Sequence, residues 1–241
     1  MFRWWLGCMV ACLSATAVAE VLHVGFGTHK PPYVFEGEPR GLEYDIVERA
    51  ARNAGFAVTA YYAPLERLHL MLRRGDIDAI ATTHERSGVE AFYSDVYIHY
   101  HNAVVALAGR GYRIERVADL GQYSVSAFQR ARFLLGPEFE RMAMNNPRYR
   151  EEALQINRNR LLYSGRIDLV VGDKRIIQYL NRDVDDQVDV SQPLAWFELF
   201  AATPYRVGFR RDDQRQRFDE GLRMLRESGE YRRIEQRYRS D

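Results

Sequence analysis

The sequence contains little cysteine and almost no lysine. Both cysteines, Cys8 and Cys12, lie within residues 1–19, so the rest of the chain has no disulfide and no thiolate chemistry. Lys30 and Lys174 are the only lysines, and every other basic side chain except histidine is an arginine. No Walker loop, no Gly-x-Ser-x-Gly motif and no His-Glu-x-x-His motif occurs. The sequence therefore gives no sign of nucleotide hydrolysis or of the common hydrolase sites.

The N-terminus has the layout of a secretory signal peptide. Arg3 precedes an apolar run, and the sequence Ala-Val-Ala at 17–19 forms a cleavage site before Glu20. The run is too short for a comfortable membrane span, and no later segment approaches that length. We expect residues 1–19 to be removed and the mature chain to lie in the periplasm. A lipid anchor at Cys12 is the alternative, and it would require an unusually short signal.

Charge and length limit the class of protein further. After cleavage at residue 19 the numbers of basic and acidic side chains are equal. Nucleic-acid binding needs a net basic face, so we expect no nucleic-acid partner. The chain of 241 residues is long enough for one large domain or for two smaller ones, each with its own core.

Apolar periodicity predicts alternating strands and helices. In the first half the predicted strands are 21–27, 56–62 and 77–83, and the predicted helices are 44–53 and 65–74. This order is typical of a parallel sheet with right-handed crossovers. The stretch 97–107 is long enough to leave this sheet and enter a second one. The elements predicted beyond it are strands at 123–128, 167–173 and 199–209 and helices at 131–144, 150–163, 174–181, 213–228 and 230–238.

One internal repeat indicates two lobes of similar build. Residues 72–80 and 162–170 match in type and order: each is a helix end, a glycine stop and an Ile-Asp-aliphatic strand. Two related α/β units would produce this repeat.

The segment 30–56 carries a resemblance to a known family. A Pro31-Pro32-Tyr33 corner is followed by Gly41, Glu43 and Asp45 at a helix start and by an alanine-rich helix. This ordered set resembles the opening of the family 3 periplasmic solute-binding proteins, the amino-acid receptors of ABC importers. The resemblance implies a two-lobe α/β fold of the type II periplasmic binding protein kind, with a parallel-dominated sheet in each lobe and a ligand cleft between them. Lobe one would comprise 20–107 plus 195–241, and lobe two 108–194.

The resemblance also implies a set of ligand-binding residues. Thr83-His84-Glu85-Arg86 looks like the family's Thr-x-x-Arg, so Arg86, with Thr83 beside it, is expected to hold a ligand carboxylate. Asp173 occupies the place of the acid that receives the ligand's ammonium, and capping the helix that follows is its alternative role. Tyr33 is expected either at the cleft or in the core.

Several positions depart from the family pattern. Lys30 stands where an aromatic residue is usual, Leu65 replaces an aromatic residue, and Ser126 begins a segment that lacks the usual Gly-Ser/Thr pair. Because Lys30 and Lys174 both fall at expected cleft positions, a ligand with additional negative charge is one hypothesis.

The function implied is capture of a small amino acid or related carboxylate by lobe closure, for an ABC importer with a membrane permease. We expect a monomer with no cofactor, no metal and no enzymatic activity. A ligand-sensing module without transport is one alternative, and an enzyme similar to cyclohexadienyl or arogenate dehydratases is another. His99 and His101 alternate along a strand and could chelate zinc, but no third ligand with suitable spacing accompanies them.

Overall fold

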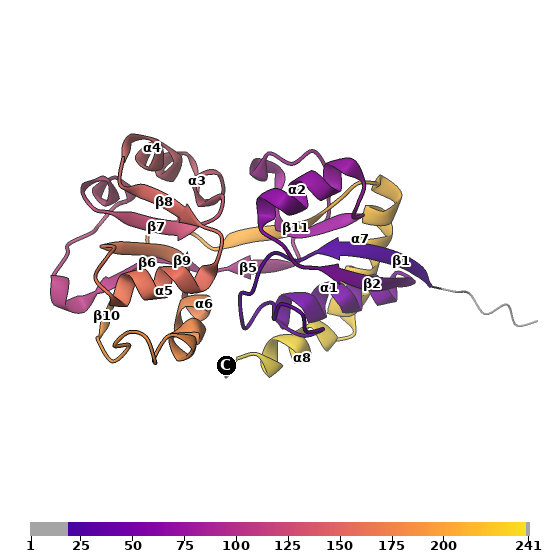
Figure 1. The fold of residues 1–241 in the computed structure, drawn as a ribbon. Coiled ribbons are helices and arrows are strands. Elements are labelled where there is room, and N and C mark those ends of the chain that lie inside the picture. The colour runs from indigo at the N-terminus through magenta and orange to yellow at the C-terminus, as the bar shows by residue number, and fades with distance from the viewer. Residues whose placement is uncertain (1–18, 240–241) are drawn as a thin grey trace, which may run out of the picture.

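Two α/β lobes lie side by side, joined by strands that pass between them (Figure 1). The structure, a computed structural model, describes residues 19–239. The predicted signal peptide, its cleavage site apart from Ala19, and the possible lipid anchor lie outside the described residues. Each lobe is built on one sheet with helices packed against it.

The sheet of lobe one has the strand order β2-β1-β3-β11-β4, and β5 pairs with β11. Strand β1 is parallel to β2 and β3, whereas β11 is antiparallel to β3, β4 and β5. The strands are β1 (Glu20–Gly25), β2 (Phe56–Tyr61), β3 (Ala79–Thr83), β4 (Phe92–Tyr93), β5 (Ile98–Tyr100) and β11 (Thr203–Phe209). The helices are α1 (Leu42–Asn53), α2 (Leu65–Arg74), α7 (Asp212–Glu227), α8 (Glu230–Arg237) and the short 3-10 helix η1 (Glu85–Ser87).

The sheet of lobe two has the strand order β10-β6-β9-β7-β8. Strands β7, β8 and β9 are parallel, and β6 is antiparallel to both β9 and β10. The strands are β6 (Asn102–Leu107), β7 (Val125–Phe128), β8 (Tyr149–Glu152), β9 (Leu169–Asp173) and β10 (Leu194–Phe197). The helices are α3 (Ala131–Leu134), α4 (Pro137–Asn145), α5 (Gln155–Tyr163), α6 (Lys174–Leu180) and the 3-10 helices η2 (Ala108–Arg110), η3 (Val117–Gln122) and η4 (Asn181–Asp183).

The predicted two-lobe α/β fold is confirmed, with differences in detail. The helix predicted over 131–144 is divided into α3 and α4, and the strand predicted over 97–107 into β5 and β6. Each sheet is mixed rather than parallel-dominated, because the strands that connect the lobes run back against the parallel core. The helix predicted from residue 150 begins only at Gln155, since Tyr149–Glu152 pairs with β7 as a strand. Strand pairing here overrides the local helical pattern.

The sheets divide the chain at slightly different positions from the predicted lobe boundaries. Strand β5 belongs to lobe one, but β6 and β10 pair within the sheet of lobe two. The first crossover therefore falls near His101 and the second between Phe197 and Thr203. Both crossovers run close to the carboxyl end of β9, because β6 starts opposite Asp173.

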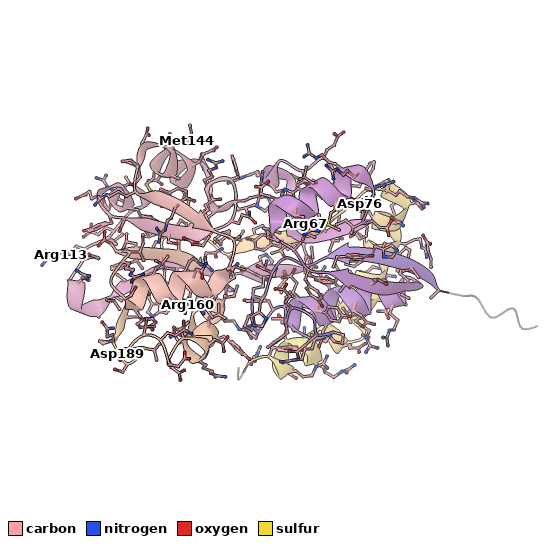
Figure 2. The ribbon with its side chains drawn as sticks, in the orientation of Figure 1. Arg67, Asp76, Arg113, Met144, Arg160 and Asp189 are labelled. Atoms are coloured by element: carbon pink, nitrogen blue, oxygen red, sulfur yellow. The ribbon has the colours of Figure 1, made fainter. Side chains whose placement is uncertain are left out.

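The outer surface carries charges of both signs on each lobe. Figure 2 shows Arg67 and Asp76 on lobe one and Arg113 and Asp189 on lobe two, and all four are exposed. Within residues 19–239, no helix combines the length and the apolar character needed to cross a membrane.

Helices α1 and α7 approach each other closely in lobe one. A Cβ atom at Gly221 of α7 would lie 2.1 Å from the carbonyl oxygen of Ala50 in α1. Gly221 is not in the left-handed region of backbone space, so its small size is what this contact requires.

We therefore expect Gly221→Ala to lower the free energy of unfolding by about 1–3 kcal/mol, the usual range for overpacking, despite alanine's better helix propensity. Urea denaturation would measure the change. Gly109→Ala is the matched control, because a Cβ there meets no atom within 4 Å. Equal stability of the two variants would contradict this account of the helix contact.

Candidate functional site

A cleft lies between the lobes at the carboxyl ends of the central strands. The empty space within it is about 550 Å³, a value that includes space open to solvent. Residues that follow or end β1, β3, β7 and β9 line it. Its charged lining groups are Lys30 from lobe one and Arg158 and Asp173 from lobe two. In open α/β sheets this edge is where ligands bind.

The lobe-one wall is organised around the buried carboxylate of Glu43. Lys30 Nζ lies 2.8 Å from Glu43 Oε2, which also accepts a hydrogen bond from the Tyr100 hydroxyl. Glu43 Oε1 accepts hydrogen bonds from the Thr82 hydroxyl and, at 2.7 Å, from the Tyr97 hydroxyl. Burial lowers the pKa of Lys30, and the attraction of Glu43 opposes this shift. The pair leaves this wall with no net charge.

Thr82 has a strained backbone conformation, and its hydroxyl contacts the Lys30–Glu43 pair. Its φ is 56°, in the left-handed region that β-branched residues rarely adopt. The conformation is supported by a hydrogen bond of 3.0 Å from Thr82 N to the Tyr97 hydroxyl. The Thr82 hydroxyl contacts both Lys30 and Glu43, so it bridges the two charged groups.

The lobe-two wall presents Asp173, the last residue of β9. Its Oδ1 accepts hydrogen bonds from the backbone N–H groups of Arg175 at 3.0 Å and Ile176 at 3.3 Å. Asp173 therefore caps the N-terminus of α6, which was the alternative role predicted for it. Its Oδ2 accepts from His101 N at 2.7 Å and from the Tyr33 hydroxyl at 3.2 Å. Burial raises the pKa of Asp173, and these donors act in the opposite direction.

Tyr33 connects the two walls. It is almost fully buried, and its ring stacks on Tyr100 with a centroid separation of 4.1 Å. Its hydroxyl crosses from lobe one to Asp173 on lobe two. Burial, followed by the nearby Asp173 charge, raises the pKa of Tyr33, so the hydroxyl remains a donor at neutral pH.

Further contacts hold the lobes together beside the cleft. Arg130 of lobe two forms an ion pair of 2.6 Å with Glu66 on α2 and also donates to the carbonyl of Ser87. The Thr28 hydroxyl donates to the carbonyl of Ala153 at 3.1 Å. The structure therefore represents a closed arrangement of the lobes.

The structure places the predicted site residues in two groups. Lys30 and Asp173 line the cleft, whereas Tyr33, Thr83 and Arg86 do not. Tyr33 is buried and reaches the site only through its hydrogen bond to Asp173. The Thr83 hydroxyl donates to Ser87 Oγ at 2.7 Å within lobe one. The carboxylate-binding role of Arg86 and Thr83 stays a prediction.

Arg86 is exposed, and its position follows from the local chain path. It lies in η1, whose start is fixed by a hydrogen bond of 3.1 Å from Arg86 N to His84 Nδ1. Its side chain borders a separate hollow that also involves Gly136 and Phe200. To reach the cleft, the side chain would have to leave this hollow.

Lys174 also lies outside the cleft. Its ammonium forms an ion pair with the exposed carboxylate of Glu198. Since Lys30 is paired with Glu43, the two lysines do not combine into a cationic pocket. The hypothesis of an additional negative charge on the ligand loses the observation on which it depended.

Two residues of the site were not selected from the sequence. Glu43, which is fully buried and pairs with Lys30, was recognised as part of a helix-start motif but was not chosen as a site residue. Arg158 was not distinguished from the many other arginines. It stands four residues before Leu162 on the buried side of α5, and an arginine on that face was the available signal.

No group of three or more His, Cys, Asp or Glu side chains suitable for a metal ion occurs in residues 19–239. His99 is exposed on β5, and His101 uses its backbone N–H to bind Asp173.

Two lobes that close over a charged cleft at their strand ends define a bilobal ligand-binding protein. The chain belongs to the bacterial extracellular solute-binding proteins, family 3, whose family model matches residues 22–241. No curated protein matches the sequence.

Solved structures show the same fold. An ancestral arginine-binding protein bound to arginine shares 20% sequence identity with a TM-score of 0.73, over 92% of this chain and 99% of that one. A histidine kinase sensor domain similar to periplasmic binding proteins shares 20% with a TM-score of 0.76, over 92% and 97%. ArtJ from Geobacillus stearothermophilus, which binds arginine, lysine and histidine, shares 16% with a TM-score of 0.74, over 92% and 96%.

The buried pair Lys30–Glu43 gives a prediction for stability. Glu43→Gln preserves the shape but leaves Lys30 without its counter-charge, and breaking a buried pair in this way costs about 3–5 kcal/mol. Lys30→Met combined with Glu43→Gln should be more stable than Glu43→Gln alone, because no uncompensated charge remains. Denaturant unfolding of the unmodified protein, of Glu43→Gln and of the double variant compares their free energies of unfolding.

Glu38→Gln serves as the control, since Glu38 and Arg40 form an exposed pair worth about 0–1 kcal/mol. If Glu43→Gln changed stability no more than Glu38→Gln, the central role of the buried pair would be disproved.

Proposed function

We propose that this protein captures a small amino acid, or a related small carboxylate, by closing its two lobes, and that it delivers the ligand to an ABC importer. The observation that carries the proposal is the interlobe cleft, which is lined by one cationic group of lobe one, Lys30, and by a cationic and an anionic group of lobe two, Arg158 and Asp173. Membership of family 3 supports the same reading.

The charge pattern of the cleft suits a zwitterion. Arg158 supplies a positive lining group and Asp173 a negative one, and the third charged lining group, Lys30, is already paired with the buried Glu43. An amino acid presents a carboxylate and an ammonium a few ångströms apart, and each needs an oppositely charged partner when water is excluded. Asp173 is the proposed partner of the ammonium, because an ionised carboxylate is an acceptor only.

Closure would be driven by the ligand itself. A ligand that contacts both lobes favours the closed state by its differential affinity for that state. The Tyr33–Asp173 and Arg130–Glu66 contacts are formed only when the lobes meet, so they add to the stability of the closed form. A membrane permease that recognises the closed form would complete the import system, with this chain as a monomeric periplasmic receptor.

A sensing role would use the same closure with a different membrane partner. The likeness to a histidine kinase sensor domain makes this the second candidate. An enzymatic role similar to a dehydratase has less support, because Asp173 in the cleft and the buried Glu43 each already accept hydrogen bonds at both oxygens.

Thermal unfolding of the chain from Glu20 onward, with each common amino acid, tests the function. A ligand at 100 times its dissociation constant adds about 2.7 kcal/mol, which corresponds to a rise in Tm of roughly 5–10 °C at this size. Asp173→Asn should abolish the rise, and Asp189→Asn, on the exposed outer surface of lobe two, should retain it. Absence of any rise across the panel would reject amino-acid capture.

Small-angle scattering tests the closing contacts. Arg130→Gln removes the ion pair to Glu66, so the ligand-free protein should become more extended and bind its ligand several-fold more weakly. Arg132→Gln is the control, because that side chain is exposed and makes no contact with lobe one through an ion pair in the described structure. The idea fails if both variants scatter as the unmodified protein does.

A further inference from the structure

Arg158 is a buried arginine that lacks a carboxylate partner. It lies in the second turn of α5 and is only 1% exposed. Its Nη1 donates to the carbonyl of Val171 at 2.7 Å, and its Nη2 donates to the side-chain oxygen of Gln155. Its Nε has no acceptor among the described residues, and no carboxylate of that part of the chain lies within ion-pair distance.

This arrangement is costly for the protein without a bound anion. A buried charge that is not neutralised destabilises the fold by several kcal/mol, and two neutral acceptors do not neutralise it. Burial lowers the pKa of Arg158 to about 10, so the guanidinium is still charged at neutral pH. A group retained at such a cost beside a cleft is a candidate for ligand binding.

The surroundings of Arg158 provide space for its guanidinium at the cleft. The side chain lines the cleft and passes over Gly172 in β9. A Cβ atom at Gly172 would lie 2.7 Å from Arg158 Nη1. Gly172 is not in the left-handed backbone region, so its contribution is the room that it leaves for the arginine.

The neighbouring acids are already committed to other donors. Asp173 is near enough to raise the pKa of Arg158, but its two oxygens accept from His101, Arg175, Ile176 and Tyr33. Glu152 also raises the pKa of Arg158, but it forms an ion pair of 3.1 Å with Arg150. Of the three charged groups that line the cleft in the described structure, Lys30 has an ion pair with Glu43, whereas Asp173 and Arg158 have none. Both oxygens of Asp173 already accept hydrogen bonds, so Arg158, whose Nε has no acceptor, is the group with unused hydrogen-bonding capacity.

We propose that Arg158 binds the carboxylate of the ligand, in place of the exposed Arg86. A guanidinium has five N–H donors, and only two are used here, so a carboxylate can accept two parallel hydrogen bonds from it. This assignment rests on the proposed function. With Asp173 as the partner of the ammonium, both charged groups of the amino acid are held by lobe two. The ligand then binds lobe two first, and lobe one closes over its remaining part.

Titration calorimetry with matched ligands tests the assignment. The probes are the amino acid that gives the largest thermal shift and its carboxamide, which keeps the ammonium and the side chain but lacks the carboxylate charge. Arg158→Gln should weaken binding of the acid by about 30-fold or more, the range for truncating one partner of a buried charge pair. It should weaken binding of the carboxamide far less, so discrimination between the two probes is lost.

Arg86→Gln is the matched control, because it removes one arginine from the exposed position, and it should keep both the affinity and the discrimination. Loss of discrimination in Arg86→Gln would overturn the assignment. Equal weakening of acid and carboxamide in Arg158→Gln would also overturn it, because a purely structural role affects both probes alike.

A second measurement does not depend on an amino-acid ligand. Sodium acetate should raise the Tm of the unmodified protein and of Arg86→Gln above the value in sodium chloride of equal ionic strength, and it should not do so for Arg158→Gln. An acetate effect without amino-acid binding would keep the Arg158 site and reject the proposed function. Amino-acid binding with no loss of discrimination in Arg158→Gln would reject the Arg158 site and keep the function. No response to either kind of probe would reject both.

Discussion

The lobe-one side of the cleft depends on supplying hydrogen-bond and charge partners to one buried carboxylate, that of Glu43. Glu43 lies at the start of α1, and its donors come from the corner after β1, from β3 and from the segment around β5. A buried carboxylate needs such partners, because an uncompensated ion in the interior costs several kcal/mol. The same hydrogen bonds fix Lys30 and Tyr100 at the cleft and hold Thr82 in its left-handed conformation. The shape of this wall is thus a consequence of solvating Glu43.

On the lobe-two side, the charged groups are held by neutral hydrogen-bond partners and not by an ion pair. Asp173 is satisfied mainly by backbone N–H groups that result from the fold itself, namely the first turn of α6 and the crossover at His101. The guanidinium of Arg158 beside it has only neutral acceptors. One wall is therefore electrostatically complete without a ligand, and the other has a positive group that still lacks a counter-charge. In the proposed function, lobe two therefore binds the charged groups of the ligand, and lobe one closes over the remaining part.

The sequence predicted elements well where a local signal was strong. Gly75 ends α2, and both bounds of that helix were predicted, because its leucines repeat at helical spacing. Tyr149–Glu152 was assigned to a helix because its strand character comes from pairing with β7, which no local pattern contains. Asp173 could be expected at the cleft because it ends a buried strand at the place where the resembled family has its acid. The position of Arg86 could not, since it depends on the turn after β3 and on His84. Arg158 was missed because its burial results from docking α5 over Gly172.

The position of the Arg158 side chain depends on the absence of a side chain at Gly172. The glycine contacts no ligand in this account, yet its missing side chain determines where the guanidinium can lie. Any larger residue at 172 would push the arginine away from β9, toward the open part of the cleft or out of it. Without an arginine at 158, this strand position would not need to be a glycine for that reason. The two positions should therefore change together during evolution, with the arginine tolerated only after the space for it exists.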